Sequence, residues 1–510
     1  MWLLLIAIAV ATFVLLVRTF KHDNHRSNLP PSPKGHWLWG HLTSFLYPIE
    51  TLHERLGALA RDHPEAVTLR AGPAWLPYWL SPPIVVLNDP ALVRQAFTGS
   101  HGSVAIGHED EIRENVATVI GGGLLGVDGK VWRSRRSHVS STFFTRDALR
   151  RAVPVVDHHL DRTVAALENR SDPEAPINMH EHYFIPLMLA IMTDLLCGSD
   201  ASHDSASGAA IDGPTPSMPW SVARDMGVVF AEFNDRTFRL FKTFRPTSQG
   251  HREALPRVRA HISSLISRRR RVLRVAAENG EEAPLGRHDL LTVLIGDGSG
   301  DGGTNPYDSD RDIEAEALLF MFAGFESASN TLAYAAHLLA RHPSVQERAR
   351  AEVMSDCQGR PGYSALAGLP YLDAVLSEAM RMYPIAHTLT RRVRRDIVLG
   401  AYQVPAGSRL LLNNLGISNA KAVWGDPENF RPERWLSEPS DRPDTFASIP
   451  FGAGLRICPG QKLAMLEMKI ILGRLLGQFR FEPDPANPNL KRRVAFVTRP
   501  QSYSVRCVPL

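Results

Sequence analysis

Apolar residues recur with the period of an α-helix along most of this 510-residue chain. The period predicts helices over six ranges: 146–167, 220–241, 252–277, 313–341, 345–353 and 371–382. Runs typical of strands are fewer and fall at 83–88, within 396–413 and near the C-terminus. The pattern therefore predicts a mainly α-helical protein with small β-sheets.

Two segments interrupt this pattern. Residues 199–218 are small and polar, and residues 296–310 are rich in Gly, Asp and Ser, so both are predicted to be solvated loops or inserts. The basic run SRRRR at 267–271 is predicted to form a solvated helix face, with a contact to an acidic partner as the alternative. The chain contains no internal repeat.

The N-terminus differs from the rest of the chain. Trp2–Val17 is apolar and carries no charge, although as a helix it is slightly short for a bilayer core of roughly 30 Å. No basic region precedes it and no small-residue cleavage site follows it, which favours an uncleaved membrane anchor over 1–20 against a signal peptide. Basic residues follow the segment, so the remainder of the chain is expected on the cytoplasmic side.

Residues 21–35 are basic and proline-rich, with prolines at positions 30, 31 and 33. Prolines at this density favour stiff, extended chain. The segment is therefore either a rigid spacer between anchor and globular part or a plain linker, and the sequence alone does not separate these alternatives.

Composition narrows the classes of protein. Hydrophobic residues make up 44% and charged residues 22% of the chain, as in a globular protein with a large core. The net charge of +4 is too weak to indicate nucleic-acid binding. The four cysteines have no paired spacing, which argues against a disulfide framework or a zinc site. They are Cys197, Cys357, Cys458 and Cys507.

The longest helical pattern, 312–343, is apolar nearly all round and is therefore predicted to be buried. Its middle, Ala323–Ser327, contains a glycine, a glutamate and a serine. The glycine costs about 1 kcal/mol in a helix, and the buried Glu326 is costly unless it is hydrogen-bonded. We therefore expect something to lie close against this turn. The alternative is a kinked core helix with a satisfied polar pair.

Two further pairs share a helical face. Trp132 and Arg136 are four residues apart and suit a bound carboxylate or phosphate, although a surface salt-bridge face is an alternative. Glu378 and Arg381 are three apart and resemble an ordinary surface ion pair. Arg434 is available to join them, and such a buried set requires full hydrogen bonding.

Cys458 lies in the irregular segment FGAGLRICPG at 451–460, between Arg456 and a predicted helix. A cation, glycine N–H groups and a helix N-terminus all favour a thiolate, the form of cysteine that binds metal. A lone cysteine with these neighbours fits an axial ligand to haem iron. The alternative is an inert cysteine buried in a turn.

Taken in order, these segments resemble the signatures of the cytochrome P450 family, the haem-thiolate monooxygenases, along the whole chain. The matches are W-x-x-x-R at Trp132 and Arg136, E-x-x-R at Glu378 and Arg381, P-E-R at Arg434, and F-x-x-G-x-R-x-C-x-G at Phe451, Gly454, Arg456, Cys458 and Gly460. The anchor and the proline-rich segment are similar to those of microsomal members.

The resemblance implies that Cys458 ligates the iron of haem b and that Phe451 shields its sulfur. It implies four residues that hold the haem propionates, among which Arg391 is ambiguous because Arg392 is adjacent. These four are Trp132, Arg136, Arg391 and Arg456.

Two further groups take their roles from the resemblance. Glu326 and Ser327 are implied to be the acid–alcohol pair that delivers protons for oxygen activation. The family usually has threonine where this chain has Ser327. A buried structural triad is implied for Glu378, Arg381 and Arg434.

The resemblance also implies one catalytic domain over 36–510, where length alone suggests several. The implied electron source is NADPH, through the flavins of a separate NADPH–cytochrome P450 reductase, with cytochrome b5 as a further partner. The implied location is the endoplasmic reticulum membrane, as a single-pass protein with a cytoplasmic catalytic domain and no nucleic-acid partner.

The implied reaction is oxidation, by hydroxylation or otherwise, of a lipophilic small molecule. The inserts are similar to those of fungal members that modify terpenoids, polyketides or fatty acids in secondary metabolism. The alternatives are a reductase-independent haem-thiolate isomerase or dehydratase, and a non-catalytic haem- or sterol-binding membrane protein.

By the same resemblance, the substrate is expected to contact residues near 100–125, 218–244, 322–328, 385–389 and 494–499. The second range is rich in phenylalanine. An apolar access route and ordinary core packing explain this richness equally well. The residues concerned are Phe230, Phe233, Phe238, Phe241 and Phe244.

Overall fold

The computed structural model describes most of the chain after residue 27. The described residues are 28–37, 39–41, 51–72, 81–98, 106–107, 110–198, 220–238, 246–279, 289–296, 305–307, 309–438, 441–487, 489–494, 497–501 and 503–510. The anchor expected at 1–20 and the insert at 199–218 lie outside this part. Within it, no helix combines the length and the apolar character needed to cross a bilayer.

The chain divides into two units, each made of several stretches of sequence. The first contains the described residues up to Asp110 together with 386–429 and 443–457. The second contains 111–385, 430–442 and 458–510. The expected mixture of many helices and small sheets is confirmed, and the sheets are distributed over both units.

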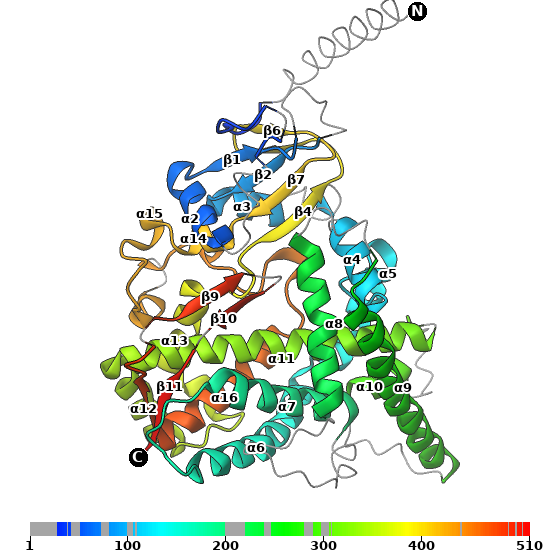
Figure 1. The fold of residues 1–510 in the computed structure, drawn as a ribbon, viewed down its shortest axis with the longest axis vertical. Coiled ribbons are helices and arrows are strands. Elements are labelled where there is room, and N and C mark those ends of the chain that lie inside the picture. Colours follow the sequence, from blue (N-terminus) through cyan, green and yellow to red (C-terminus); the bar gives the residue numbers. More distant parts are fainter. Residues whose placement is uncertain are drawn as a thin grey trace, which may run out of the picture. The chain divides into compact units, whose positions relative to one another are not determined.

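A five-stranded sheet in the order β1–β2–β7–β4–β3 organises the first unit. Its strands are β1 (Ala66–Leu69), β2 (Ile84–Leu87), β3 (Ile106–Gly107), β4 (Leu389–Val393) and β7 (Arg409–Leu412). β2 and β7 are parallel and the other neighbours are antiparallel. Figure 1 shows the yellow strands β4 and β7 beside the blue β2, so segments remote in sequence share one sheet.

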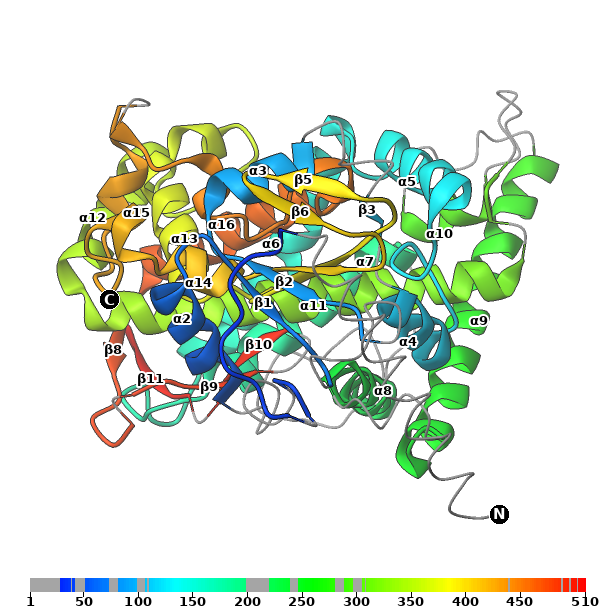
Figure 2. The same ribbon diagram turned by 90° about the horizontal axis from the view of Figure 1, so that it is seen from above.

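Short elements complete the first unit. The hairpin β5 (Ile397–Leu399) with β6 (Tyr402–Val404) forms a separate two-stranded sheet, drawn as paired arrows in Figure 2. The remaining elements are α2 (Leu52–Asp62), α3 (Pro90–Thr98), α14 (Asn414–Ser418), α15 (Lys421–Trp424) and the 3₁₀ turns Thr445–Ala447 and Gly454–Arg456. The predicted strand region 396–413 thus forms three strands, because turns at 400–401 and 405–408 break it.

The proline-rich segment is hydrogen-bonded along its described part. Thr68 of β1 donates from its backbone N–H to Pro31 O and from its hydroxyl to Pro30 O, each at 2.8 Å. Asn28 exchanges hydrogen bonds with the β5–β6 hairpin, through Ala401 O and the N–H of Gln403. Residues 28–33 therefore lie along the first unit.

The second unit is built from helices. They are α4 (Asp110–Ile120), α5 (Gly129–Thr142), α6 (Arg146–Glu168), the π-helical turn η3 (His180–Phe184), α7 (Ile185–Cys197), α8 (Trp220–Phe238), α9 (Gln249–Glu278), α10 (Leu290–Ile295), α11 (Asp310–Arg341), α12 (Pro343–Cys357), the 3₁₀ turn Ala365–Gly368, α13 (Pro370–Met382), the 3₁₀ turn Pro432–Trp435 and α16 (Gln461–Gln478). Two hairpin sheets pair β8 (Phe479–Pro483) with β11 (Val505–Pro509) and β9 (Lys491–Val494) with β10 (Thr498–Gln501).

The helix α11 is the centre of the second unit's core. Ser309 caps it by accepting the Asp312 N–H on its side-chain oxygen, and two aspartates in the first turn suit the helix dipole. Nearly every residue from Ala315 to Ala340 is buried, except around Ala323–Ser327. α11 packs against α7, α13, α16 and β8. Its predicted burial is confirmed.

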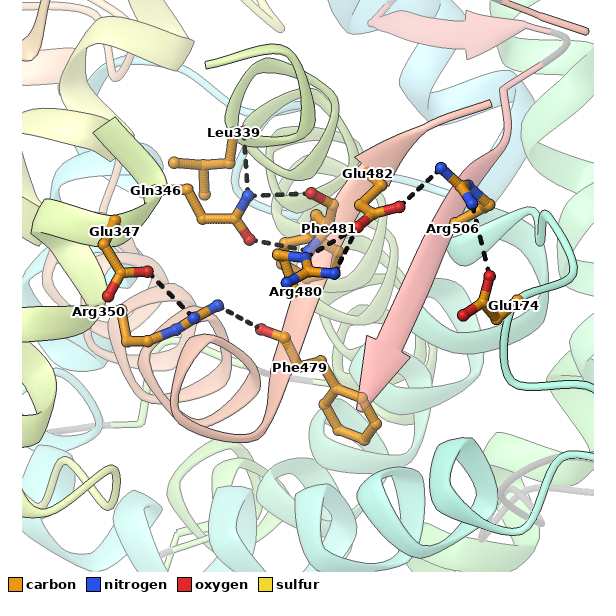
Figure 3. Close-up of polar contacts among 10 residues, drawn as sticks. All are labelled: Glu174, Leu339, Gln346, Glu347, Arg350, Phe479, Arg480, Phe481, Glu482 and Arg506. Carbon is orange, nitrogen blue, oxygen red and sulfur yellow. Dashed lines mark hydrogen bonds and ion pairs between the residues drawn. The ribbon is translucent and has the colours of Figure 1, made fainter. Parts of the chain in front are cut away.

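Side chains of α12 form hydrogen bonds to backbone groups of β8, in the sheet of β8 and β11, and of α11 (Figure 3). The Gln346 amide accepts from the Phe481 N–H at 2.8 Å and donates to Phe481 O at 2.9 Å and to Leu339 O at 3.2 Å. Arg350 donates to Phe479 O at 3.1 Å. Gln346 thus pairs with β8 as a neighbouring strand would, and this contact satisfies an edge of the hairpin.

The basic run at 267–271 is only partly a solvated face. Arg270 and Arg271 are exposed, but Arg269 is buried and ion-paired with Asp289. Its Nε also donates to Thr292 Oγ1 at 2.6 Å. The prediction was wrong for Arg269, because a run of like charges does not reveal which member turns toward the next helix.

Candidate functional site

Cys458 lies directly before α16, and donors from that helix start converge on its sulfur. The N–H groups of Gly460 and Gln461 form hydrogen bonds to it, and the Arg136 guanidinium lies close enough to favour its charged form. Burial has the larger effect and raises the pKa of the thiol. The residue as a whole is nevertheless exposed. A sulfur that is partly enclosed and surrounded by donors has the environment of a metal-ligating thiolate.

The α5 helix supplies the expected Trp132 and Arg136. Trp132 is buried, Arg136 is half-buried, and burial lowers the pKa of Arg136 while Cys458 opposes this shift. The salt bridge of this helix belongs to the intervening Arg135, which pairs with Asp312 at 2.7 Å. Arg136 is thus placed beside the thiolate candidate.

An aromatic residue that the sequence pattern does not mark lies beside the cysteine segment. A side-chain carbon added to Gly460 would lie 3.8 Å from the Phe144 ring and 3.9 Å from the Cys458 sulfur. The Phe144 ring is also 5.9 Å from that of Phe320 on α11. Phe144 therefore connects the cysteine segment to the central helix.

The Ala323–Ser327 turn of α11 carries the expected alcohol in a local hydrogen bond. Ser327 Oγ donates to Ala323 O at 2.7 Å, and the helix continues through the turn. Ala323 is exposed and Ser327 partly exposed, in a helix that is otherwise buried. These two positions share a helical face, so this face is open to a ligand.

A side chain of the protein itself lies so close to residue 324 that only glycine fits there. A Cβ at this position would come within 2.4 Å of Met192 Sδ on α7. The expected close contact therefore exists, and Met192 makes it. The glycine allows α7 and α11 to approach each other, and the adjacent Ala323 face remains accessible.

Glu326 points to a different face of α11 and is buried. Arg499 of β10 donates from Nη2 to Glu326 Oε1 at 2.8 Å. Burial raises the pKa of the Glu326 carboxyl, while the charge and hydrogen bond of Arg499 lower it. The second oxygen, Oε2, is buried and has no hydrogen-bond partner among the described residues.

In the first unit, Phe97 lies between two of the predicted haem-binding segments. The Arg391 guanidinium stands over its ring, 5.2 Å from the centroid. A Cβ on Gly454 would lie 2.7 Å from Phe97 O, and Gly454 has a φ of +68°, so only glycine fits. Arg391 is buried on β4 and Arg392, on the opposite face, is half-buried. The two arginines therefore point to opposite faces of β4 and differ in burial. Through Phe97, Arg391 lies near the segment that contains Phe451 and Arg456.

The structure brings Glu378, Arg381 and Arg434 together with full hydrogen bonding. Arg381 donates from Nε and Nη2 to the two oxygens of Glu378, both at 2.9 Å. Arg434 Nε donates to Oε1 at 2.9 Å, and Trp435 Nε1 donates to Oε2 at 2.9 Å. Glu378 and Arg381 are completely buried. The alternative of a surface ion pair is therefore wrong, and sequence reasoning missed Trp435.

Comparison with known proteins gives the family. The family model described as Cytochrome P450 matches residues 30–507, nearly the whole chain. The chain belongs to the cytochrome P450 family. Its similarity to individual members is moderate, since it is 28% identical to human cytochrome P450 4F12 over 96% of this chain and 92% of that protein.

Other P450s align over similar lengths. Cytochrome P450 4F4 of Rattus norvegicus is 29% identical over 96% of this chain and 92% of its own length. Cytochrome P450 3A29 of Sus scrofa is 27% identical over 81% of this chain and 79% of its own length. The protein is thus a P450 monooxygenase, and the cofactor of the family is a haem whose iron a cysteine thiolate ligates.

The residues of this P450 fit that cofactor. Cys458 is exposed as a residue and its sulfur receives N–H donors, which favour a thiolate. Within the second unit, Trp132 and Arg136 supply an N–H and a cation from the same helix. Cations and N–H donors are the groups that bind carboxylates such as propionates.

The phenylalanines of α8 that the structure describes belong to core packing. Phe230 stacks on Phe322 of α11 with centroids 3.8 Å apart, and Phe233 contacts the same ring edge-on at 6.4 Å. All three are buried. Phe325 is half-buried at the border of this cluster, 6.3 Å from Phe322. The Phe238 side chain, Phe241 and Phe244 lie outside the described residues.

Proposed function

We propose that this P450 monooxygenase oxidises a lipophilic small molecule at the endoplasmic reticulum membrane, with electrons from NADPH delivered by a separate reductase. The observation that carries the proposal is the environment of Cys458, an exposed residue whose sulfur receives N–H donors from Gly460 and Gln461. The apolar N-terminal segment and the basic residues after it support the membrane location.

In this proposal, Cys458 ligates haem iron, Phe451 shields the sulfur, and a set of donors binds the propionates. When bound, haem supplies the activation of dioxygen by stepwise electron transfer, which no side chain can perform. The propionate donors are Trp132, Arg136, Arg391 and Arg456.

The Ser327 hydroxyl is proposed to pass protons to the reacting oxygen. Its hydrogen bond to Ala323 O keeps the hydroxyl on the accessible face of α11. Glu326 supplies these protons, since burial raises the pKa of its carboxyl, while the charge and the hydrogen bond of Arg499 act in the opposite direction. A carboxyl whose protonated form is favoured by burial can donate a proton to a neighbouring hydroxyl.

The substrate is proposed to be apolar, with a terpenoid, polyketide or fatty-acid-like skeleton from secondary metabolism. The accessible face of α11 offers a methyl group at Ala323, and no charged residue of α11 faces solvent there. Cytochrome b5 is a proposed additional electron donor.

The test uses the full-length protein and the variant Cys458→Ala, each reduced under carbon monoxide. The parent is expected to show the thiolate-type absorption band and the variant to lack it. Product analysis with NADPH and reductase then follows a substrate screen by haem absorption shift. A parent protein without the band, or a band that survives in the variant, overturns the proposal.

Two other functions remain distinguishable by simple assays. A haem-thiolate isomerase or dehydratase would convert a hydroperoxide without reductase or NADPH. The presence of both Glu326 and Ser327 favours the monooxygenase, because such an isomerase needs no proton delivery. A non-catalytic haem- or sterol-binding protein would be indifferent to Ser327→Ala, whereas the monooxygenase would form less product per NADPH consumed.

A further inference from the structure

A buried carboxyl of α11 holds the loop between α4 and α5. The Leu124 N–H donates to Glu316 Oε1 at 3.1 Å, although the two residues are 192 positions apart in the sequence. Both are buried, and Glu316 is completely so. The loop backbone also lies directly on the helix, since a Cβ on Gly123 would come within 3.1 Å of Ala315 O and 3.0 Å of Leu319 Cδ2. Glycine at this position therefore allows the loop to pack against α11.

This contact lies beside the accessible face of α11. Ala315, Leu319 and Ala323 follow one another at intervals of four residues, so they share one side of the helix. The loop covers the first two of these residues, and the third is exposed. The loop of residues 121–126 therefore borders the face that the proposed function assigns to the substrate.

The 121–126 loop begins with three glycines in a conformation that other residues rarely adopt. Gly121, Gly122 and Gly123 have φ values of +93°, +135° and +88°. Because glycine has no Cβ, this run can change its direction without steric strain. Hydrogen bonds hold its present form, since the Gly121 N–H donates to Ala117 O at 3.0 Å and the Gly126 N–H donates to Gly123 O at 2.8 Å. The run is suited to act as a hinge between α4 and the rest of the loop.

The Glu316 carboxyl lacks the partners that a buried charge requires. Burial raises its pKa to about 7, while the Leu124 N–H and the charge of Arg135 lower it. The Arg135 guanidinium is already paired with Asp312 at 2.7 Å. Glu316 Oε2 and the buried Tyr307 hydroxyl have no hydrogen-bond partner among the described residues. The closed loop therefore favours the neutral carboxyl, in which a proton on Oε2 leaves Oε1 free to accept from Leu124.

Other ionisable groups near the loop have contacts of their own. His251 of α9 donates from Nε2 to Val119 O at 3.0 Å, and His138 of α5 donates to a carbonyl of α10 at 2.8 Å. α10 itself contains no charged residue, and on α7 Asp194 pairs with His159 at 2.8 Å. The charged or ionisable groups that face the carboxyl or the loop come from α5, α9, α11 and the turn before α11. They are Arg135, His138, His251, Arg259, Tyr307 and Asp312.

We propose that Glu316 holds the 121–126 loop closed on α11 in its neutral form and releases the loop when it ionises. Release moves the carboxyl into water, where a glutamate has a pKa of about 4.3. The open form then binds fewer protons than the closed form, so a rise in pH favours opening. With a pKa of about 7 in the closed form, the ratio of open to closed loop rises about tenfold between pH 6 and pH 8. The consequence for substrate entry rests on the proposed function, because that proposal places the substrate on this face of α11.

The test follows amide hydrogen exchange of residues 121–126 by mass spectrometry in the full-length haem-loaded protein. Exchange of the Leu124 N–H requires the loop to leave Glu316, and each measured rate is divided by the intrinsic rate at that pH. In the parent, protection of this amide is expected to fall about tenfold from pH 6 to pH 8. Glu316→Gln keeps an acceptor for Leu124 but cannot ionise, so its protection should not depend on pH. Because this variant leaves the nearby histidines in place, it assigns the effect to Glu316.

Glu314→Gln is the matched control, because Glu314 also lies on α11 but accepts from Ser263 Oγ of α9. It is expected to behave as the parent does. Gly122→Ala tests the hinge separately. A Cβ there meets no atom within 4 Å, but a φ of +135° strains alanine, so protection should fall at both pH values. Equal corrected protection of the parent at pH 6 and pH 8 overturns the inference, as does a tenfold change that survives in Glu316→Gln.

A second measurement is the rate at which metyrapone, an apolar pyridine compound whose nitrogen binds ferric haem, shifts the haem absorption. The rate is expected to be higher at pH 8 than at pH 6 in the parent and equal at both in Glu316→Gln. Equal parent rates overturn the role in substrate entry. Failure of the proposed function is distinguishable, because the parent would then lack the carbon monoxide band or an NADPH-dependent product, while protection of Leu124 would still depend on pH.

Discussion

Arg434 Nε donates to Glu378 Oε1 at 2.9 Å, although the two residues are 56 positions apart in the sequence. The same carboxylate accepts two N–H groups of Arg381, the indole N–H of Trp435 and the backbone N–H of Arg431. Because the carboxylate is completely buried, its charge is tolerable only through these donors. The contact ties α13 to the Pro432–Trp435 turn.

Replacement of one member of this buried ion-pair group is expected to destabilise the folded protein strongly. Arg434→Gln and Glu378→Gln should each lower the free energy of unfolding by about 3–5 kcal/mol, because a buried charge or donor set loses its counterpart. Urea denaturation, followed by circular dichroism, measures the loss. The control is Arg270→Gln, which breaks the exposed ion pair with Asp310 and should cost less than about 1 kcal/mol. An equal loss of unfolding free energy in the Glu378–Arg434 variants and in Arg270→Gln would contradict the structural role of the triad.

Cys458 is expected to be the one cysteine whose loss abolishes the thiolate-type spectrum. Cys458→Ala should remove the carbon monoxide band, because alanine offers no ligand to iron. The comparison is Cys357→Ser, since Cys357 lies at the end of α12, where it donates its S–H to Val353 O and its sulfur accepts N–H groups of Gly359 and Arg360. This variant should retain the band at full amplitude. Retention of the band in Cys458→Ala would require another ligand.

Ser327 is expected to determine what fraction of the electrons taken from NADPH is used to form product. Ser327→Ala should lower product per NADPH by about tenfold or more, since it removes the hydroxyl proposed to transfer protons. Ser327→Thr should preserve coupling, because it keeps the hydroxyl. Ser329→Ala serves as the control, because that buried hydroxyl donates to the backbone oxygen of Glu326 at 3.2 Å. Loss of coupling in Ser329→Ala alone would place the proton route elsewhere.

Glu467 of α16 is expected to make stability depend on pH. It is buried, its Oε1 has no partner among the described residues, and burial raises its pKa to about 8. An unfolded glutamate has a pKa of about 4.3, so the unfolded state ionises first as pH rises. The folded state therefore loses stability relative to the unfolded state between these two values.

Glu467→Gln removes the carboxyl whose raised pKa lowers the stability of the folded state as the pH rises. Relative to the parent, the variant should gain several kcal/mol of unfolding free energy at pH 8 and much less at pH 5, as measured by denaturation at both values. The exposed Glu278→Gln provides the comparison and should give the same small difference at both. A Glu467→Gln effect that is independent of pH would mean that the carboxyl is ionised throughout, with a donor that balances its charge.

Local pattern predicted the helices well for identifiable reasons. α6 begins at the expected Arg146, where Thr145 accepts the Ala148 N–H, and α13 covers the predicted 371–382 range. The short-range features of the cysteine segment also agree with expectation, since the Gly460 and Gln461 N–H groups that face the sulfur are its neighbours in sequence. Capping and helix periodicity act over a few residues, so a sequence displays them directly.

The sequence by itself determined the helical class, the buried central helix and the set of residues that match the family signatures. Only the tertiary structure decided which charged residues are buried. It separated Arg391 from Arg392, buried Arg269, completed the Glu378 group with Trp435 and paired Glu326 with Arg499. Each of these depends on contacts between segments far apart in the chain. Such contacts depend on how helices and strands pack against one another. The sequence around one of these charged side chains therefore does not identify its partner.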